Sequence, residues 1–331
     1  MKKIFIILAI TYISNFTFAQ NPNLGTAGAQ FLQIPVGARS ESMGGAIVGL
    51  ANDASAVFWN PAGIVKVENV QVHFTNMNWF DLFDFNAASI VYNTGDFGTI
   101  AANMLIFSTG DMEITTEEKP NGTGRYFDAE DISFGISYAK YLTDRFSVGL
   151  STKYINQRIW NESASGIAFD IGTQYTLDFK NLTIAMCMKN FGADMKLDGP
   201  DLGFTYLKDE NYPFSRLVPG SLSTQGYPMP LNFQVGIGFE VLKYDFIEIN
   251  GAIDVSHLND NNERAHFGTE VSLFDRLFMR AGYKYNYDVQ DYTFGAGANV
   301  PFGDTNINFD YSYSLYNILP NVHSISINLS Y

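Results

Sequence analysis

The chain ends with Asn321-Val-His-Ser-Ile-Ser-Ile-Asn-Leu-Ser-Tyr331, and this stretch decides the fold class. Counted back from Tyr331, apolar residues alternate with small polar ones, which predicts a strand with one apolar and one polar face. Such a strand with an aromatic end is typical of outer-membrane β-barrels, whose last strand closes the cylinder and places its aromatic residue at the membrane interface. We therefore expect an all-β membrane protein in which Tyr331 belongs to the membrane insertion signal.

The other end of the sequence predicts export. Met1-Lys2-Lys3 is basic, residues 4–13 are apolar, and Thr17-Phe-Ala19 offers small residues for cleavage. This order predicts a signal peptide over residues 1–19, with Gln20 as the first mature residue. After it no apolar run approaches the roughly 18 residues that a transmembrane helix needs, so we expect none.

The composition fits a membrane barrel. The chain is 46% hydrophobic and 15% aromatic, with only 16% charged residues, against about 25% in soluble domains. The net charge of −14 makes nucleic acid an unexpected partner. Cys187 is the only cysteine, so we expect a packed thiol and no internal disulfide.

From residue 70 onward the sequence repeats one unit, a stretch of about ten alternating residues followed by a turn. No helix or second sheet is predicted to cover the apolar faces, whereas lipid outside and a wet lumen satisfy both faces. We predict an antiparallel transmembrane β-barrel of about 14 strands over residues 70–331. The expected strands are 70–80, 85–94, 97–108, 129–141, 145–158, 163–177, 180–190, 231–242, 245–257, 263–274, 277–288, 291–300, 305–315 and 321–331.

The connections support this count. Tight turns occur at every second connection, and the longest loops, 109–128 and 192–230, fall among the others. Outer-membrane barrels have short periplasmic turns and longer extracellular loops. We therefore expect the N- and C-termini in the periplasm.

Residues 20–69 do not alternate and are rich in Gly and Ala. Asn52 or Asp53 is suited to cap a short helix, and Asn60-Pro61 is expected to end it. We interpret this segment as an N-terminal hatch that plugs the barrel.

Three motifs in this segment resemble a known family. Residues 34–46 contain Gly37-Ala-Arg39 and Met43-Gly44-Gly45-Ala46, and Asn52-Asp53-Ala54 and Asn60-Pro61-Ala62-Gly63 follow. The order resembles the hatch of FadL-like outer-membrane proteins, and more closely the PorV/PorQ family of Bacteroidota. The resemblance implies a Gram-negative outer-membrane barrel of the type IX secretion system. Such proteins hold secreted cargo by its C-terminal domain, or belong to the machinery that attaches it at the cell surface.

The hatch residues Met43, Gly44, Gly45, Asp53, Asn60 and Pro61 are the first candidate site. Two interpretations stand for Asp53, Asn60 and Pro61. They form a gate, or they are helix caps and turns that anchor the hatch, and capping alone explains their residue types.

The loop 192–230 is the second candidate, because exposed aromatic side chains on a proline-rich loop suit a protein partner. The alternative is a loop folded back over the barrel mouth. A smaller cluster at residues 79–85 fits an aromatic belt at the membrane interface. The candidate partner-binding residues of the loop are Phe204, Tyr206, Tyr212, Phe214, Leu217 and Tyr227.

The charged lumen residues either line a solute path or pair with one another, and pairing is favoured for a plugged barrel. They are Lys153, Glu240, Glu248, Asp254, Glu270, Arg280, Lys284 and Asp310.

No metal or cofactor site is expected. Residues 259–263 lack the calcium-loop pattern and suit a solvated turn. The four histidines lie on different strands without ligand or triad spacing.

The predicted function is therefore non-enzymatic. A barrel of the PorV/PorQ type binds cargo or secretion partners through its extracellular loops. The alternative is a FadL-like uptake channel for hydrophobic solutes. Besides the type IX cargo and attachment components, outer-membrane lipids are the expected partners.

Overall fold

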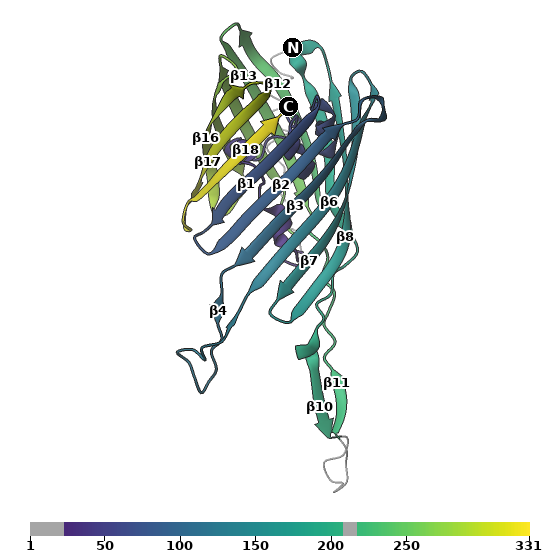
Figure 1. The fold of residues 1–331 in the computed structure, drawn as a ribbon, viewed down its shortest axis with the longest axis vertical. Helices are drawn as coiled ribbons and strands as arrows, with labels where there is room; N and C mark the ends of the chain where they lie inside the picture. Colours follow the sequence, from purple (N-terminus) through teal and green to yellow (C-terminus); the bar gives the residue numbers. More distant parts are fainter. Residues whose placement is uncertain (1–22, 208–216) are drawn as a thin grey trace, which may run out of the picture.

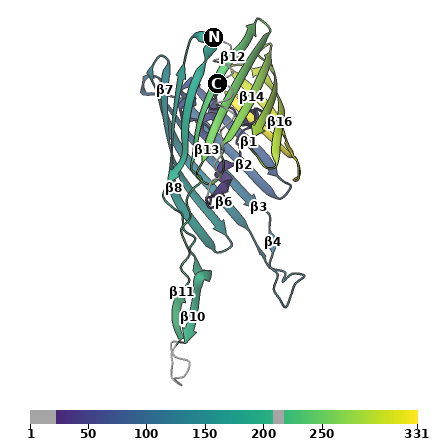
Figure 2. The same ribbon diagram turned by 180° about the vertical axis from the view of Figure 1, so that it is seen from behind.

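A computed structural model describes residues 23–207 and 217–331, and its fourteen longest strands close into one antiparallel barrel (Figures 1 and 2). β1 pairs with β18, which completes the ring. The predicted barrel is confirmed, with strand bounds within a few residues of those expected. The barrel strands are β1 (Val70–Trp79), β2 (Phe83–Asn93), β3 (Thr99–Thr109), β6 (Ala129–Thr143), β7 (Phe146–Ile159), β8 (Glu162–Thr176), β9 (Thr183–Gly192), β12 (Asn232–Tyr244), β13 (Ile247–Leu258), β14 (Arg264–Leu273), β15 (Leu277–Tyr285), β16 (Gln290–Phe302), β17 (Thr305–Tyr316) and β18 (Val322–Ser330).

The last strand shows which face is outside. Ser324 and Ser326 of β18 are each 1% exposed, whereas Ile325 is 55% exposed and Leu329 41%. The apolar side chains therefore point out of the barrel and the hydroxyls point into it. This arrangement suits a wall with lipid outside, and the alternation read from the sequence is confirmed.

The two mouths of the barrel differ. One, which we call the turn end, carries the short connections, including the 3-10 helices η4 (Gly95–Phe97) and η5 (Phe179–Asn181). Tyr331 also lies at the turn end, where its N–H donates to the carbonyl of Val70 at 3.0 Å. The other mouth, the loop end, carries the long connections, as the sequence predicts.

Two long loops at the loop end contain strands that the sequence analysis missed. One pairs β4 (Met112–Glu113) with β5 (Tyr126–Phe127). In the other, η6 (Pro200–Leu202) precedes the pair β10 (Gly203–Leu207) and β11 (Leu217–Ser221). Both hairpins project away from the barrel (Figure 1).

The chain before β1 lies inside the lumen (Figure 2). It forms η1 (Gln30–Gln33), α2 (Ala38–Ser42), η2 (Ala54–Phe58) and η3 (Pro61–Lys66). α2 contacts β15 to β18, η2 contacts β1 and β2, and η3 contacts β3 and β6 to β8. No helix in the described ranges is long and apolar enough to cross a membrane.

One expectation about this segment needs correction. Asn60-Pro61 was expected to end a single helix, and η2 does end at Phe58. However, Asn60 also caps a second helix, η3, which begins at Pro61. Proline suits this first position because its missing N–H has no partner within the helix.

The described chain starts and ends at opposite mouths. The N–H of Gly25 donates to the carbonyl of Asp260, in the loop-end connection between β13 and β14, at 3.1 Å, whereas Tyr331 lies at the turn end. The segment before β1 therefore runs through the lumen. The expectation that both termini lie in the periplasm stays a prediction. The predicted signal peptide 1–19 and Gln20 lie outside the described residues.

Candidate functional site: two cavities divided by the hatch

The segment of residues 25–67, which we call the hatch, leaves a cavity on each side of it. The loop-end cavity has a volume of about 670 Å³ and the turn-end cavity about 660 Å³. Charged and amide side chains dominate the turn-end cavity. The lumen thus changes from largely apolar to polar across the hatch. Apolar residues that line the loop-end cavity include Phe31, Leu32, Ile34, Val36, Phe58, Trp59, Trp79, Phe80, Leu105 and Phe107.

Three cations that line the loop-end cavity lie near aromatic rings: Lys284, whose Nζ is 5.6 Å from the ring centre of Tyr287, and two others, Lys189 and Arg264. The Nζ of Lys189 is 4.9 Å from the ring centre of Trp59, and the guanidinium carbon of Arg264 is 4.2 Å from that of Tyr287. Within the described part of the chain neither forms an ion pair with a carboxylate. Both positive charges are therefore available to a ligand.

Met43-Gly44-Gly45 turns the hatch tightly against the wall. Gly44 and Gly45 have φ of 68° and 81°, a region that favours glycine. A Cβ at Gly44 would lie 3.0 Å from the backbone nitrogen of Tyr283, and one at Gly45 would lie 3.1 Å from Nδ1 of His266. These glycines therefore allow both the turn and its close approach to β14 and β15.

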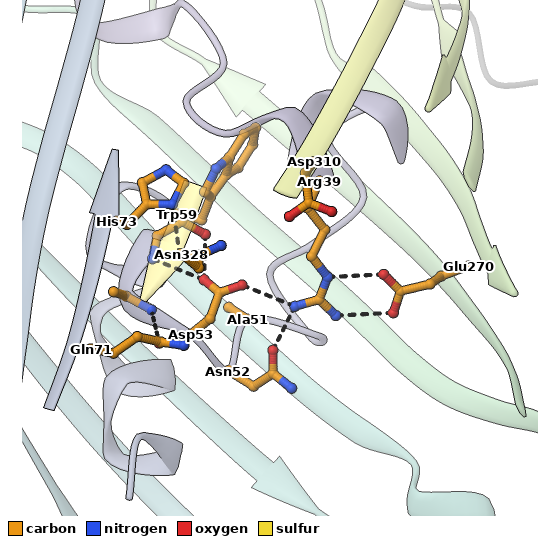
Figure 3. A network of polar contacts seen from close by, with 12 residues as sticks. Arg39, Ala51, Asn52, Asp53, Trp59, Gln71, His73, Glu270, Asp310 and Asn328 are labelled. Atoms are coloured by element: carbon orange, nitrogen blue, oxygen red, sulfur yellow. Dashed lines mark hydrogen bonds and ion pairs between the residues drawn. The ribbon is translucent and has the colours of Figure 1, made fainter. Parts of the chain in front are cut away.

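Arg39 joins α2 to the wall and to the rest of the hatch (Figure 3). Its Nε and Nη2 donate to the two carboxylate oxygens of Glu270 on β14, at 3.0 and 3.1 Å. Its Nη1 donates to Asp53 at 3.1 Å and to Asn52 at 2.6 Å. The sequence analysis quoted Arg39 in a motif but gave it no role.

The wall side of this contact is itself an ion-pair network. Arg280 on β15 donates to Glu270 and to Asp310 on β17, both at 2.6 Å. Lys153 pairs with Asp170 at 2.9 Å, and Lys243 pairs with Glu248 at 2.6 Å. Glu270, Arg280 and Asp310 thus pair within the predicted set, which confirms the preference for pairing for these three, whereas Lys153 and Glu248 pair with residues outside that set. Lys284, however, pairs with Glu41 of the hatch at 3.1 Å.

Asp53 is a helix cap, as one of the two interpretations predicts, and a gate role stays a prediction. Its carboxylate accepts the N–H of Ser55 at 2.9 Å, which caps η2, and it also binds Arg39. Burial favours a raised pKa for Asp53, but the Arg39 charge and the Ser55 hydrogen bonds outweigh it and hold the pKa below its usual range. The carboxylate therefore stays ionised beside Arg39.

Asn60 and Pro61 anchor the hatch to β7 and β8. Asn60 Oδ1 accepts the N–H of Ala62 at 3.1 Å, and its Nδ2 donates to the carbonyl of Thr173 at 3.1 Å. A Cβ at Gly149 would lie 2.3 Å from the carbonyl carbon of Pro61. The wall is therefore hollowed by a glycine where Pro61 sits, so these two residues act as anchors in this structure.

The loop 192–230 divides into two parts. Phe204, Tyr206 and Leu217 lie on the projecting hairpin and are exposed. Tyr227 instead turns into the barrel mouth, where its hydroxyl donates to Gln157 at 3.2 Å. The folded-back interpretation thus holds for Tyr227, whereas partner binding by the exposed hairpin stays a prediction. Tyr212 and Phe214 lie outside the described residues.

The aromatic cluster at residues 79–85 does not form an interface belt. Trp79 and Phe80 line the loop-end cavity, and Phe85 is fully buried. The belt interpretation is wrong for these three residues. Phe80 and Asp81 have positive φ, so the β1–β2 turn departs from strand alternation.

Several residues with clear contacts gave no usable signal in the sequence. Asp260, in a segment expected to be a solvated turn, accepts hydrogen bonds from Gln30 and Gln33 of the hatch. Glu41 lies far in sequence from its partner Lys284. A run of polar residues does not reveal such partners, because they depend on how the hatch sits in the lumen.

Fold and cavities together define a fourteen-stranded antiparallel β-barrel with a hatch in its lumen. A family model described as "Uncharacterised protein family (UPF0164)" matches residues 15–331, and the chain belongs to this family. A "UPF0164 protein" of Treponema pallidum (strain Nichols) is 26% identical over 172 residues, which are 49% of this chain and 43% of the relative. The match thus spans less than half of the relative's length.

Solved channel barrels share the fold. The Ralstonia pickettii toluene transporter TbuX superposes with a TM-score of 0.59 at 12% identity, covering 89% of this chain and 98% of that one. The CymD monoaromatic hydrocarbon channel gives 0.57 at 13% identity, with 90% and 98% covered. The FadL-like barrel implied by the motif resemblance is confirmed. The finer placement in the PorV/PorQ family stays a prediction.

Proposed function

We propose that this protein is an outer-membrane channel for uptake of a hydrophobic solute, and that the loop-end cavity is its binding site. The observation that carries this function is the largely apolar cavity of about 670 Å³ closed off by the hatch from a polar cavity. Ligand pockets are typically apolar, of about 300–1,000 Å³, with a few polar groups. The loop end then faces outward and the turn end faces the periplasm.

The similarity to solved hydrocarbon channels favours this function over the secretion role. TbuX is called a toluene transporter and CymD a monoaromatic hydrocarbon channel. This function is the alternative in our sequence analysis. No catalytic role is proposed.

The cavity suits a solute with an acidic head group. Lys189 and Arg264 present positive charge to an otherwise largely apolar wall, and each rests on an aromatic ring. A carboxylate would pair with these cations, while its apolar chain would contact residues such as Phe31 and Phe107. A neutral hydrocarbon would leave both charges unpaired.

Fluorescence quenching tests the site and the head group together. Trp59 and Trp79 line the cavity, so a terminally brominated long-chain acid bound there should quench them in a Trp160→Phe background. The matched alcohol should bind about tenfold more weakly, the value of one charge-assisted hydrogen bond. The double variant Lys189→Met, Arg264→Met should abolish this difference, whereas Lys243→Met, a cation of the turn-end cavity, should preserve it. Absence of quenching by both ligands would contradict the binding site.

A second candidate function rests on the projecting hairpin. Phe204, Tyr206, Leu207 and Leu217 are 45–66% exposed on β10 and β11, and clustered exposed apolar side chains suit a protein partner. The role implied by the PorV/PorQ resemblance, holding secreted cargo by its C-terminal domain, would use this surface. Its membership of type IX secretion stays a prediction.

A deletion separates the two functions. Replacing residues 203–221 by a short Gly-Ser linker removes the hairpin and spares all fourteen barrel strands. For the holding function, a purified type IX C-terminal domain should bind the full chain and not the deletion. Quenching by the brominated acid should survive the deletion, because the hairpin residues do not line the cavity. Equal cargo binding by both proteins would rule out the hairpin as the holding surface.

A further inference from the structure

One part of the hatch separates the two cavities along β14 to β18. Residues 37–45, which we call the flap, contain α2. Arg39 lines the turn-end cavity, whereas Glu41 binds Lys284, which lines the loop-end cavity. The two charged side chains of one short helix thus bind the wall on opposite sides of the hatch.

The flap is held to the wall mainly by polar contacts. Glu41 accepts hydrogen bonds from Lys284 at 3.1 Å and from Gln290 at 2.8 Å. Two further hydrogen bonds involve its neighbours. The Ala38 N–H donates to the Ser326 hydroxyl at 2.8 Å, and the Thr293 hydroxyl donates to the Ser42 carbonyl at 3.1 Å. The bidentate pair of Arg39 with Glu270 adds to these contacts. Ser314 also donates to Glu41, and the carbonyls of Gly44 and Gly45 accept from His266 at 2.7 Å and from Gln234 at 3.3 Å. Met43, which packs with Ala46 and Ala252, provides the apolar contact.

The chain on both sides of the flap is fixed. Before it, the Trp59 indole N–H donates to the carbonyl of Val36 at 2.8 Å. After it, Asp254 on β13 accepts the N–H groups of Ile47 and Val48 at 2.9 and 3.0 Å. Beyond this point η2 and η3 pack through apolar residues. That cluster comprises Ala51, Ala54, Ala56, Val57, Ile64, Val65 and Val67 of the hatch with Val91, Ala101 and Ala139 of the wall.

Glycines with positive φ mark both ends of the flap, Gly37 at 97° and Gly44-Gly45 at 68° and 81°. Such positions absorb backbone rotation at low cost. Water can replace the hydrogen bonds and ion pairs of a polar interface, so separating it costs only the net contribution of each contact, which is smaller than the gross strength of that contact. Separating the apolar interface of η2 and η3 would expose its surface to water without compensation.

We propose that the flap swings away from β14 to β18 about these glycines while η2 and η3 stay in place. The ion pair of Arg39 with Glu270 is the latch. The wall behind the flap carries small inward residues, Gly268, Gly282, Gly295 and Ser312. Opening the flap therefore joins the two cavities along this face of the barrel. This inference goes beyond the proposed uptake function because it names the moving part.

Hydrogen exchange of the native protein is the first test. Amides of residues 38–46 should exchange at least about tenfold faster than those of 54–66, because local opening sets the exchange rate. Glu270→Gln should accelerate hydrogen exchange only at the flap amides. Asp170→Asn is the matched control, since it removes a buried carboxylate that binds Lys153 and does not touch the hatch. Equal exchange rates in residues 38–46 and 54–66, or faster exchange of both segments in Glu270→Gln, would overturn the proposal.

Thiol labelling is the second test and uses two serines that are each at most 1% exposed. Ser312 lies on β17 behind the flap, and Ser147 lies behind η3, where its hydroxyl donates to the Ala62 carbonyl at 3.2 Å. In a Cys187→Ala background, Ser312→Cys should react with a small charged thiol reagent at least about tenfold faster than Ser147→Cys. Glu270→Gln should raise only the first rate. Faster or equal labelling at position 147 would refute a moving flap.

Both readouts need no solute, so they decide on the flap even if the binding experiment fails. Heat-modifiable migration of each variant in gels confirms that the barrel has folded. If Glu270→Gln does not fold, the exchange pattern of the native protein still decides whether residues 38–46 or residues 54–66 move.

Discussion

Asn60 shows how one side chain can hold three parts of the molecule together. It caps η3, and its Nδ2 donates to the carbonyls of Val48 in the hatch, at 3.3 Å, and Thr173 in β8, at 3.1 Å. Asn60 is fully buried, so removing it leaves buried groups without partners. Each such group costs about 1–3 kcal/mol.

We therefore predict that Asn60→Ala loosens the hatch before the barrel unfolds. The variant should lower the hatch's free energy of unfolding by about 2–3 kcal/mol. Urea titration followed by Trp59 fluorescence, in a Trp79→Phe, Trp160→Phe background, measures it. Asn161→Ala removes an exposed amide that bonds Asp201 and should leave the midpoint unchanged. Identical midpoints for the two variants would contradict the anchoring role.

Some contacts of the hatch residues can be predicted from the sequence, and others cannot. Asp53 was one of two residues predicted as a cap, because a cap bonds the backbone two residues on and the signal is therefore local. The contact of Arg39 with Glu270 joins residues 231 positions apart. It depends on which wall strand faces α2, and no local pattern encodes that.

At the scale of elements, closure depends on the terminal strand. β18 pairs with β17 on one side and with β1 on the other. Without it both neighbours would present open edges, whose unpaired backbone groups are not tolerated in lipid. The strand thus serves the whole ring.

Deleting residues 322–331 should therefore abolish membrane insertion. The expected result is loss of the folded, heat-modifiable band from the outer-membrane fraction. A matched deletion of residues 112–127 removes the β4–β5 hairpin and keeps all barrel strands, so it should insert normally. A stable, inserted chain lacking 322–331 would disprove the strand assignment.

The length and composition of a strand explain whether the sequence predicts it. Barrel strands of 9–15 residues repeat their alternation often enough to be recognised. β4 and β5 have two residues each, too few for a period. β11 contains Pro219 and Gly220, residues that usually argue against a strand.

At the scale of the whole molecule, the wall holds itself together separately from the hatch. Arg280, Glu270 and Asp310 pair with one another on three strands, and Lys153 pairs with Asp170 on two more. A barrel emptied of its hatch would therefore keep a charged, wet lumen. Its width would be limited by the ring of fourteen strands.

We predict that deleting residues 23–66, with the signal peptide kept, converts a nearly closed barrel into an open pore. Single-channel conductance in planar bilayers should rise at least about tenfold, because barrels slightly larger than this one already hold an aqueous channel. Deletion of residues 203–221 should leave the conductance at the native value, since the described strands β10 and β11 lie outside the barrel. The emptied barrel should also unfold at lower urea concentration, because it loses the apolar contacts of η2 and η3. An inserted, folded variant that conducts no better than the native chain would show that something other than the hatch closes the lumen.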